Sequence, residues 1–191
     1  MSKWDLYDNK FNNTGIVIND TDEIPDGMYH YSINTWILNS KKQLLLIRNT
    51  LNYNIHYPGF WNSINGNVLH GESPIDTCIR AIDAKIGIKI SNSDIKKIDT
   101  KLRDPYHYIY ETYIVYKDID LNDICFADNT AVQAKWIDLE ELYNMIENGE
   151  IAWVLIPRIE EYVIPLMKET NWSISLLLLV FSIYFIEFLN D

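Results

Sequence analysis

The chain has 191 residues and a mass of 22.5 kDa, which suits one domain with a sizeable core and a short appendage. Hydrophobic residues make up 48% and aromatic residues 13% of it, which excludes disorder for most of its length. The 16 Lys and Arg against 27 Asp and Glu give a net charge of −11, which repels a phosphate backbone, so we expect no nucleic-acid polymer as a partner. A site for a small nucleotide or pyrophosphate is still compatible with this charge.

Cysteine usage and the first residues indicate the compartment. Cys78 and Cys125 form no CxxC pattern and have no histidine cluster beside them, so neither a disulfide framework nor a zinc site is indicated. The chain starts without the apolar core of a signal peptide. We therefore expect a reducing environment and a cytoplasmic protein.

The first half of the chain is rich in strand signals. Alternating and then continuous apolar residues over 29–47, interrupted by a polar turn at 39–42, predict a hairpin. A further strand is predicted over 60–64, directly after Pro58 and Gly59. These segments predict the start of a sheet.

A helix is predicted over 74–86. Ser73 is a good N-cap residue, Pro74 suits the first helical position, and Gly87 is a typical stop. Apolar residues at helical spacing between them predict one buried side, which includes Cys78 as a core thiol.

The second half adds three strands and two helices. Strands are predicted over 95–102, 106–116 and 131–137, a helix capped by Asp138 through 146, and another over 156–168. This order predicts an α+β class protein in which a mixed sheet lies between helices, an α/β/α sandwich.

The loop and helix between Gly66 and Ile88 carry a recognisable motif. Their residues resemble the Nudix box, the signature of hydrolases that act on nucleoside diphosphates linked to another group. The matching positions are Gly66, Glu72, Arg80, Ile82, Gly87 and Ile88. The resemblance implies a Nudix domain over residues 1–170, a small-molecule pyrophosphate or nucleotide as substrate, and Mg²⁺ or Mn²⁺ as cofactor.

The three other positions of the box hold Ala81, Ala84 and Lys85 in place of glutamates. Residues at these spacings share one face of a helix, where three carboxylates could gather Mg²⁺ against a pyrophosphate. Two methyl groups and an ammonium cannot do so, although Lys85 could neutralise a phosphate directly. The replacement argues against ordinary Mg²⁺-dependent hydrolysis.

A wider resemblance, which includes Trp4, His30 and residues 58–61 and 136–142, is to the Nudix branch similar to isopentenyl-diphosphate isomerase. The catalytic cysteine and a metal-ligand histidine of that branch fall on Asn65 and Asn67 here. His30 matches another metal-ligand histidine, and Glu111 matches a glutamate on a strand. The resemblance thus implies a metal set of His30, Glu72 and Glu111, with Glu72 and Glu111 as catalytic candidates.

Structural roles are open for the same residues. His30 can be a hydrogen-bonded strand residue, Glu111 a pocket-wall residue, and Glu72 can pair with Arg80 to hold the loop against the helix. Several aromatic residues could stack a nucleobase or simply pack in the sheet: Tyr106, Tyr108, Tyr110, Trp36 and Trp61.

The C-terminal segment 171–191 changes abruptly in composition. Residues 172–189 are almost all apolar and as a helix would reach about 27 Å, the lower edge of a bilayer span. Three interpretations are open: a membrane anchor, a helix packed on the domain or on a second copy in a homodimer, and an altered tail.

Two functions follow from the motif. In the first, the chain is a Nudix hydrolase in which a relocated set such as Glu72, Glu111 and Asp128 holds the metal. In the second, it is a catalytically inactive Nudix module that binds a nucleotide, a phosphorylated metabolite or a protein partner. Carboxylate geometry and affinity for divalent metal distinguish the two.

Overall fold

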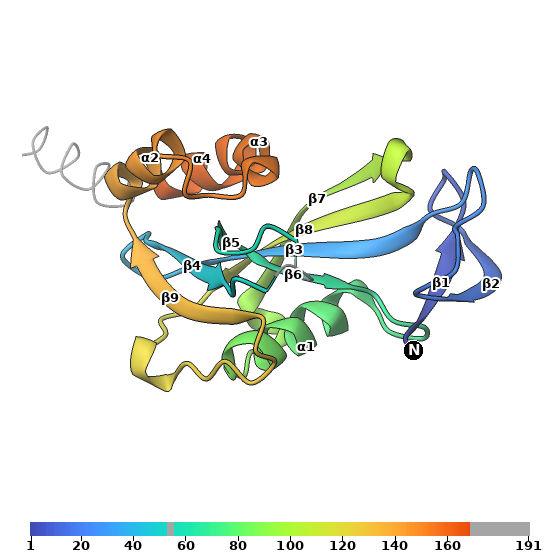
Figure 1. The fold of residues 1–191 in the computed structure, drawn as a ribbon, viewed down its shortest axis with the longest axis horizontal. Helices are drawn as coiled ribbons and strands as arrows, with labels where there is room; N and C mark the ends of the chain where they lie inside the picture. Colours follow the sequence, from blue (N-terminus) through green and yellow to red (C-terminus); the bar gives the residue numbers. More distant parts are fainter. Residues whose placement is uncertain (53–55, 169–191) are drawn as a thin grey trace, which may run out of the picture.

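A mixed sheet between two helical layers forms the body of the molecule, with a small hairpin at one end (Figure 1). The computed structural model describes residues 1–52 and 56–168, and the hydrophobic segment 171–191 lies outside these residues. The hairpin consists of β1 (Lys3–Tyr7) and β2 (Asn13–Asn19), which pair antiparallel. The predicted α/β/α arrangement is confirmed.

The main sheet has seven strands. They are β3 (His30–Leu38), β4 (Leu44–Asn49), β5 (Trp61–Asn62), β6 (Ile64–Asn67), β7 (Ile95–Arg103), β8 (Tyr108–Tyr116) and β9 (Ala131–Ile137). Their order is β5-β4-β3-β8-β7, while β6 also pairs with β3 and β9 with β4. β3 and β8 run parallel, and the other pairs are antiparallel.

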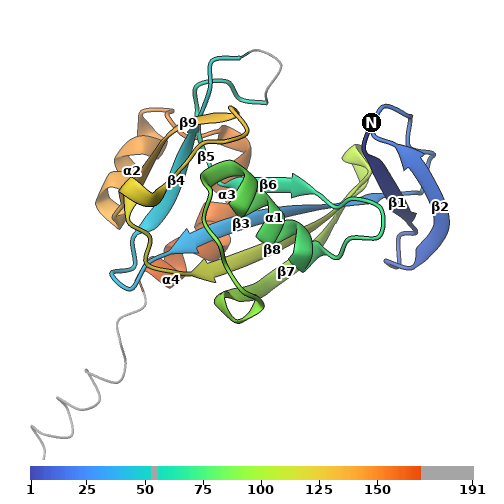
Figure 2. The same ribbon diagram turned by 90° about the horizontal axis from the view of Figure 1, so that it is seen from below.

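Central strand β3 is buried on both faces, and its alternate side chains enter two different cores. Ile33 and Ile37 belong to the cluster that contains the apolar side of α1 (Pro74–Ile86). Trp36 and Leu38 belong to the cluster that contains the opposite helical layer. Figure 2 shows α1 lying across the sheet on the face opposite to that layer.

Local sequence explains the bounds of α1. The Ser73 side chain accepts a hydrogen bond from the backbone N–H of Asp76, and the Asp76 side chain reciprocates at the Ser73 backbone, which forms a capping box. Gly87 ends the helix in the left-handed conformation at φ 71°. A Cβ there would also lie 3.2 Å from Cys125 Cβ. The predicted helix is confirmed from end to end.

The opposite layer is formed by α2 (Leu139–Glu147), α3 (Ile156–Arg158), a π-helical turn (Ile159–Val163) and α4 (Ile164–Lys168). Asp138 caps α2 through a 2.9 Å hydrogen bond from Glu141 N, as predicted. The predicted helix over 156–168 is helical throughout but contains the π turn.

Two features differ from the sequence prediction. The strand expected over 60–64 is divided at Ser63 between β5 and β6, and the hairpin β1–β2 was not predicted. Across the ranges 1–52 and 56–168, no helix is both long and apolar enough to cross a membrane.

We expect Ser73→Ala to lower the free energy of unfolding by about 1 kcal/mol, because it removes the acceptor for an otherwise unpaired N–H of α1. Urea denaturation monitored by far-UV circular dichroism measures the change. Ser73→Thr keeps the hydroxyl and is the matched control. Equal losses in both variants would contradict a capping role.

Candidate functional site

Glu72 and Arg80 tie the motif loop to α1. The Arg80 guanidinium donates from Nε to Glu72 Oε1 at 2.7 Å and from Nη2 to Glu72 Oε2 at 2.8 Å. Glu72 also accepts from Thr77 Oγ1 at 2.6 Å and from the backbone N–H of Leu69 at 3.2 Å. Burial alone would raise the pKa of Glu72, but these hydrogen bonds outweigh it and hold the pKa below its usual range. The predicted structural pair is confirmed.

Gly66 allows α1 to approach β6. A Cβ at this position would lie 3.2 Å from Thr77 Cγ2 and 3.3 Å from Ala81 Cβ. Ala81 is 4% exposed, so this first position of the replaced glutamates faces the sheet and not open solvent. Close packing of helix and strand is therefore the role of Gly66 here.

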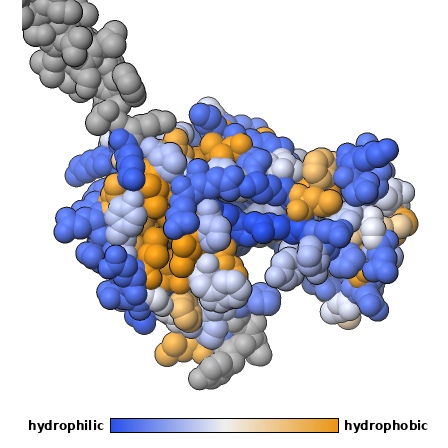
Figure 3. Space-filling model, turned by 90° about the horizontal axis from the view of Figure 1, so that it is seen from above, coloured by the Kyte–Doolittle hydropathy of each residue, from blue (hydrophilic) through white to orange (hydrophobic). Residues whose placement is uncertain are grey.

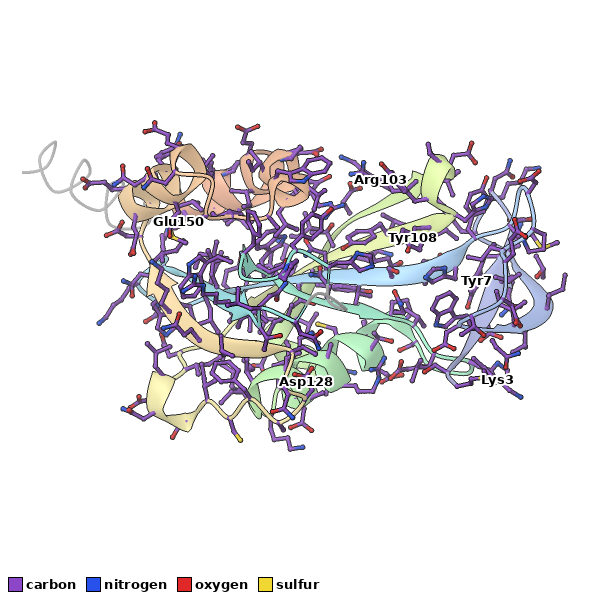
Figure 4. The ribbon with its side chains drawn as sticks, in the orientation of Figure 1. Lys3, Tyr7, Arg103, Tyr108, Asp128 and Glu150 are labelled. Atoms are coloured by element: carbon purple, nitrogen blue, oxygen red, sulfur yellow. The ribbon has the colours of Figure 1, made fainter. Side chains whose placement is uncertain are left out.

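Lys85 is held by the loop before β9. Its Nζ donates to Thr130 Oγ1 at 2.9 Å and lies 3.7 Å from Asp128 Oδ2. Figure 4 shows Asp128 beside α1, on the side of the sheet away from α2–α4. The predicted phosphate-binding ammonium thus already has an acceptor and an anionic partner within the chain.

Glu111 is buried in β8 on the α1 face. Lys97 Nζ donates to its Oε1 at 2.5 Å, and the hydroxyl of Tyr113 donates to its Oε2. Burial, reinforced by the hydrogen bond to Glu111, raises the pKa of Tyr113 strongly. Lys97 is therefore the counter-ion of Glu111, and Tyr113 remains protonated.

His30 is buried at the start of β3, 1% exposed, between two aromatic rings. The Trp4 ring stacks on it at 4.0 Å between centroids, and Tyr108 contacts it edge to face at 4.6 Å. Burial lowers the pKa of His30 to about 4, so its ring is neutral at physiological pH. Its Nδ1 has no hydrogen-bond partner.

The structure does not bring the predicted metal set together. Glu111 lies opposite Ile33 across the β3–β8 pair, and Ile33 is three residues from His30, so the two side chains project from opposite faces of the sheet. Both carboxylate oxygens of Glu72 are bound by the Arg80 guanidinium. Among residues 1–52 and 56–168, no three His, Cys, Asp or Glu side chains are grouped as metal ligands. These residues do not fit a bound Mg²⁺ or Mn²⁺ ion.

A polar surface covers the other face of the sheet, toward α2–α4. The register places its side chains in successive rows: Arg103, Tyr108 and His30; then Lys101, Tyr110, Ser32 and Asn67; then Asp99, Thr112, Asn34 and Asn65. We call this the polar face. Figure 4 shows Arg103 and Tyr108 on this side, between the helical layer and the hairpin. Figure 3 shows the surface hollowed next to the hairpin, with strongly hydrophilic residues in between.

Hydrogen bonds link the strands across this face. Asn34 Nδ2 donates to Asn65 Oδ1 at 2.7 Å, and Ser32 Oγ donates to Asn67 Oδ1 at 2.7 Å. Tyr110 OH also donates to Asn65 Oδ1, at 3.2 Å. The two asparagines at the positions of the isomerase branch's cysteine and histidine therefore act here as hydrogen-bonding residues.

Four buried polar atoms in the described residues have no hydrogen-bond partner, and all four belong to this side of the sheet. Three of them, His30 Nδ1, Asn34 Oδ1 and Arg103 Nε, lie on the polar face, and the fourth, Trp36 Nε1, lies in the apolar core next to it. Buried polar atoms are usually paired, and an unpaired one costs about 1–3 kcal/mol. Their concentration on one face marks that face as the candidate binding site.

Most of the residues on this face were not predicted as a site from the sequence. The signal that could have revealed it is the alternation in β3, where polar His30, Ser32 and Asn34 occupy every second position of a buried strand. Arg103 carried no such signal, because its place depends on the register of β7 and β8.

Comparison with known proteins identifies the family. The family profile described as "NUDIX domain" matches residues 28–159, more than half of the chain. The chain therefore belongs to the Nudix family, as its sequence motif indicated.

Relatives agree with this assignment. The chain is 26% identical over 154 residues to an uncharacterized Nudix hydrolase, lmo0368, of Listeria monocytogenes, covering 78% of this chain and 88% of the relative. It is 27% identical over 136 residues to isopentenyl-diphosphate Delta-isomerase of Escherichia coli, covering 69% and 73%. The predicted likeness to that branch is thus confirmed as a similarity.

Solved structures share the fold. DR0079 from Deinococcus radiodurans superposes with a TM-score of 0.62 at 20% identity, covering 78% of this chain and 91% of that one. The NUDIX domain of Shewanella oneidensis NrtR, solved in complex with ADP ribose, superposes with a TM-score of 0.55 at 15% identity, covering 75% and 90%. At these identities the likeness concerns the fold alone.

The Glu72–Arg80 pair makes a direct prediction about stability. In a double-mutant cycle of Glu72→Gln and Arg80→Gln, we expect a coupling free energy of about 1 kcal/mol, because the two-point hydrogen bond is charged but partly open to solvent. Urea denaturation of the four proteins measures it. Additive losses would contradict a direct pair.

The buried ring of His30 predicts a pH dependence of stability. Its pKa is about 4 when folded and about 6.5 when unfolded, so the unfolded chain binds the proton first. Stability is unaffected above about pH 6.5 and falls, by up to about 3 kcal/mol, as the pH decreases from 6.5 to 4. His30→Gln removes this contribution.

Urea denaturation of the native protein and of His30→Gln between pH 4 and 7.5 gives the difference between their free energies of unfolding at each pH. Carboxylates titrate in both proteins and cancel in the difference. A profile that is flat between pH 4 and 6.5 would contradict a buried neutral imidazole.

Proposed function

We propose that this chain is a Nudix-family module that binds a small nucleotide-like or phosphorylated ligand on its polar face and does not catalyse metal-dependent pyrophosphate hydrolysis. The observation that carries the proposal is the set of three unpaired buried polar atoms on that face, His30 Nδ1, Asn34 Oδ1 and Arg103 Nε. A ligand that supplied their missing partners would recover the free energy that their burial costs.

The alternative of a relocated hydrolytic centre at Glu72, Glu111 and Asp128 has weaker support. Each of these carboxylates has a cation of the chain as its counter-ion: Arg80 for Glu72, Lys97 for Glu111, and Lys85 for Asp128. The helix face that would have to gather a metal presents two methyl groups beside an ion-paired ammonium. Without a metal to polarise the phosphoryl group, the arrangement lacks the main source of rate enhancement in such reactions.

Nucleotide-like ligands are the first class to test, because Nudix proteins of the same fold include one solved with ADP ribose. Calorimetric titration of the full chain with ADP-ribose, ADP and isopentenyl diphosphate, with Mg²⁺ and then with EDTA, tests binding. Release of AMP from ADP-ribose, and of inorganic phosphate from ADP and isopentenyl diphosphate, tests turnover in the same mixtures. We expect binding that EDTA leaves unchanged and none of these products. Turnover that requires Mg²⁺ or Mn²⁺ and is lost in Glu72→Gln or Glu111→Gln would overturn the proposal.

Lys85 provides a second prediction. Because its ammonium lies beside Asp128, we expect Mg²⁺ to leave the melting temperature of the native protein unchanged. Lys85→Glu places a second carboxylate beside Asp128, and the repulsion between them should lower the melting temperature in the absence of metal. Millimolar Mg²⁺, bound between the two carboxylates, should then raise the melting temperature of this variant by several degrees. Lys85→Gln, which adds no charge, is the control and should show no Mg²⁺ response. A Mg²⁺ response in the native protein would argue for an intact metal centre.

The roles proposed for 172–189, a membrane contact or a homodimer contact, stay predictions because this segment lies outside the described residues.

A further inference from the structure

Two arginines at the edge of the polar face lack the anionic partners that arginines usually have. Arg103 ends β7 and faces Tyr108, and Arg158 ends α3 with its guanidinium carbon 4.3 Å from the centre of the Tyr110 ring. Within the described residues, neither guanidinium has a carboxylate at ion-pair distance, whereas Arg80 is paired with Glu72. Arg48 also lacks a carboxylate partner within the described residues, but it donates to Gly59 O and Gln133 Oε1 away from the polar face, so Arg103 and Arg158 are the two such arginines beside that face.

Both arginines act on the same phenol. Burial raises the pKa of Tyr110, and the positive charges of Arg158 and Arg103 oppose that rise. The Tyr110 hydroxyl is directed to Asn65 Oδ1 at 3.2 Å, so Tyr110 connects the two guanidinium groups to the hydrogen-bonded centre of the polar face. Two cations near one ring repel each other, and an anion bound between them would remove that repulsion.

The geometry leaves hydrogen-bond donors free for such an anion. Arg158 also has a side-chain hydrogen bond with Tyr110, which leaves the other N–H groups of its guanidinium available at the edge. Arg103 Nε is a buried donor without a partner. A ligand can reach the outer residues of this region, which are partly exposed: Arg103, Arg158, Tyr108 and Tyr110. His30 and Asn34, on the neighbouring strand β3, are buried.

From these observations we propose that Arg103 and Arg158, together with Tyr110, form an anion-binding subsite that takes the phosphoryl group of the ligand. Arginine forks match phosphate oxygens in two-point geometry. The amides and hydroxyls of Asn34, Asn65 and Ser32 then face the neutral, hydrogen-bonding part of the same molecule. The inference rests on the proposed function and deepens it by naming the phosphoryl group and the residues that hold it.

The subsite is tested with the full chain and two groups of probes in calorimetry at constant ionic strength. Inorganic phosphate and diphosphate test the anion subsite alone, and AMP against adenosine tests a complete ligand. The variants are Arg103→Gln and Arg158→Gln. Arg48→Gln is the matched control, because Arg48 also lacks a carboxylate partner among the described residues but lines a different surface pocket of about 270 Å³ beside Gly59 and Glu150.

We expect each of the two variants to weaken the binding of diphosphate and AMP by about tenfold or more, since a hydrogen bond to a charged group is worth that factor. The affinity for adenosine should be unchanged. Arg48→Gln should change none of these affinities. Arg158→Lys keeps the charge without the planar fork and should recover only part of the affinity. Near-UV circular dichroism confirms that each variant retains its packing.

The remaining outcomes separate the two proposals. Diphosphate binding that depends on Arg103 and Arg158, with no affinity for AMP or the other nucleotides, would support the subsite and overturn the nucleotide-like ligand class. AMP binding that is unaffected in all three variants would overturn the subsite and leave the proposed function standing. AMP binding that is lost only in Arg48→Gln would overturn the subsite and also the polar face as the place of binding. Absence of binding for every probe would overturn both.

Discussion

The requirement that β3 be buried on both faces governs the architecture. A strand at the centre of a sheet must find a separate core for each set of alternate side chains, and β3 does so with α1 on one face and α2–α4 on the other. In the apolar half of the strand, around Trp36 and Leu38, the side chains are buried by packing against other apolar side chains. The other half, from His30 to Asn34, buries polar groups on one face, and hydrogen bonds must replace packing there. The polar face exists because of this change of composition along one strand.

The α1 face of the same sheet shows how charges can be satisfied within a chain. Glu72, Glu111 and Asp128 lie in three different elements, and each is matched by a cation from a neighbouring element. The side-chain ammonium groups of Lys85 and Lys97 neutralise Asp128 and Glu111, so these carboxylates do not need a cation from solvent. A fixed ammonium cannot polarise a phosphoryl oxygen or activate water as a divalent ion does. The same pairs therefore support the proposal that the chain does not hydrolyse its ligand.

Sequence predicted the parts of the fold that depend on local signals. The caps of α1 and α2 are determined by neighbours within three residues, and the 29–47 hairpin by its turn and apolar runs, so these were found with accurate bounds. The β1–β2 hairpin was missed because β2 is mostly exposed and offers no buried alternation to detect. Within the site, the Glu72–Arg80 pair was predictable because its spacing on a loop and a helix fixes its geometry.

The polar face was harder to predict because it depends on register. A bulge between Lys97 and Asp99 shifts the β7–β8 pairing by one residue, and this shift decides that Asp99, Lys101 and Arg103 share a face with Tyr110. Without it, Arg103 would project toward α1. The π-helical turn after Arg158 likewise has no reliable sequence signal. The bulge thus sets the face on which Arg103 lies, and the π-helical turn directly follows Arg158. Bulges and π turns are frequent at functional sites, so these two irregularities, each next to one arginine of the proposed subsite, are consistent with that proposal.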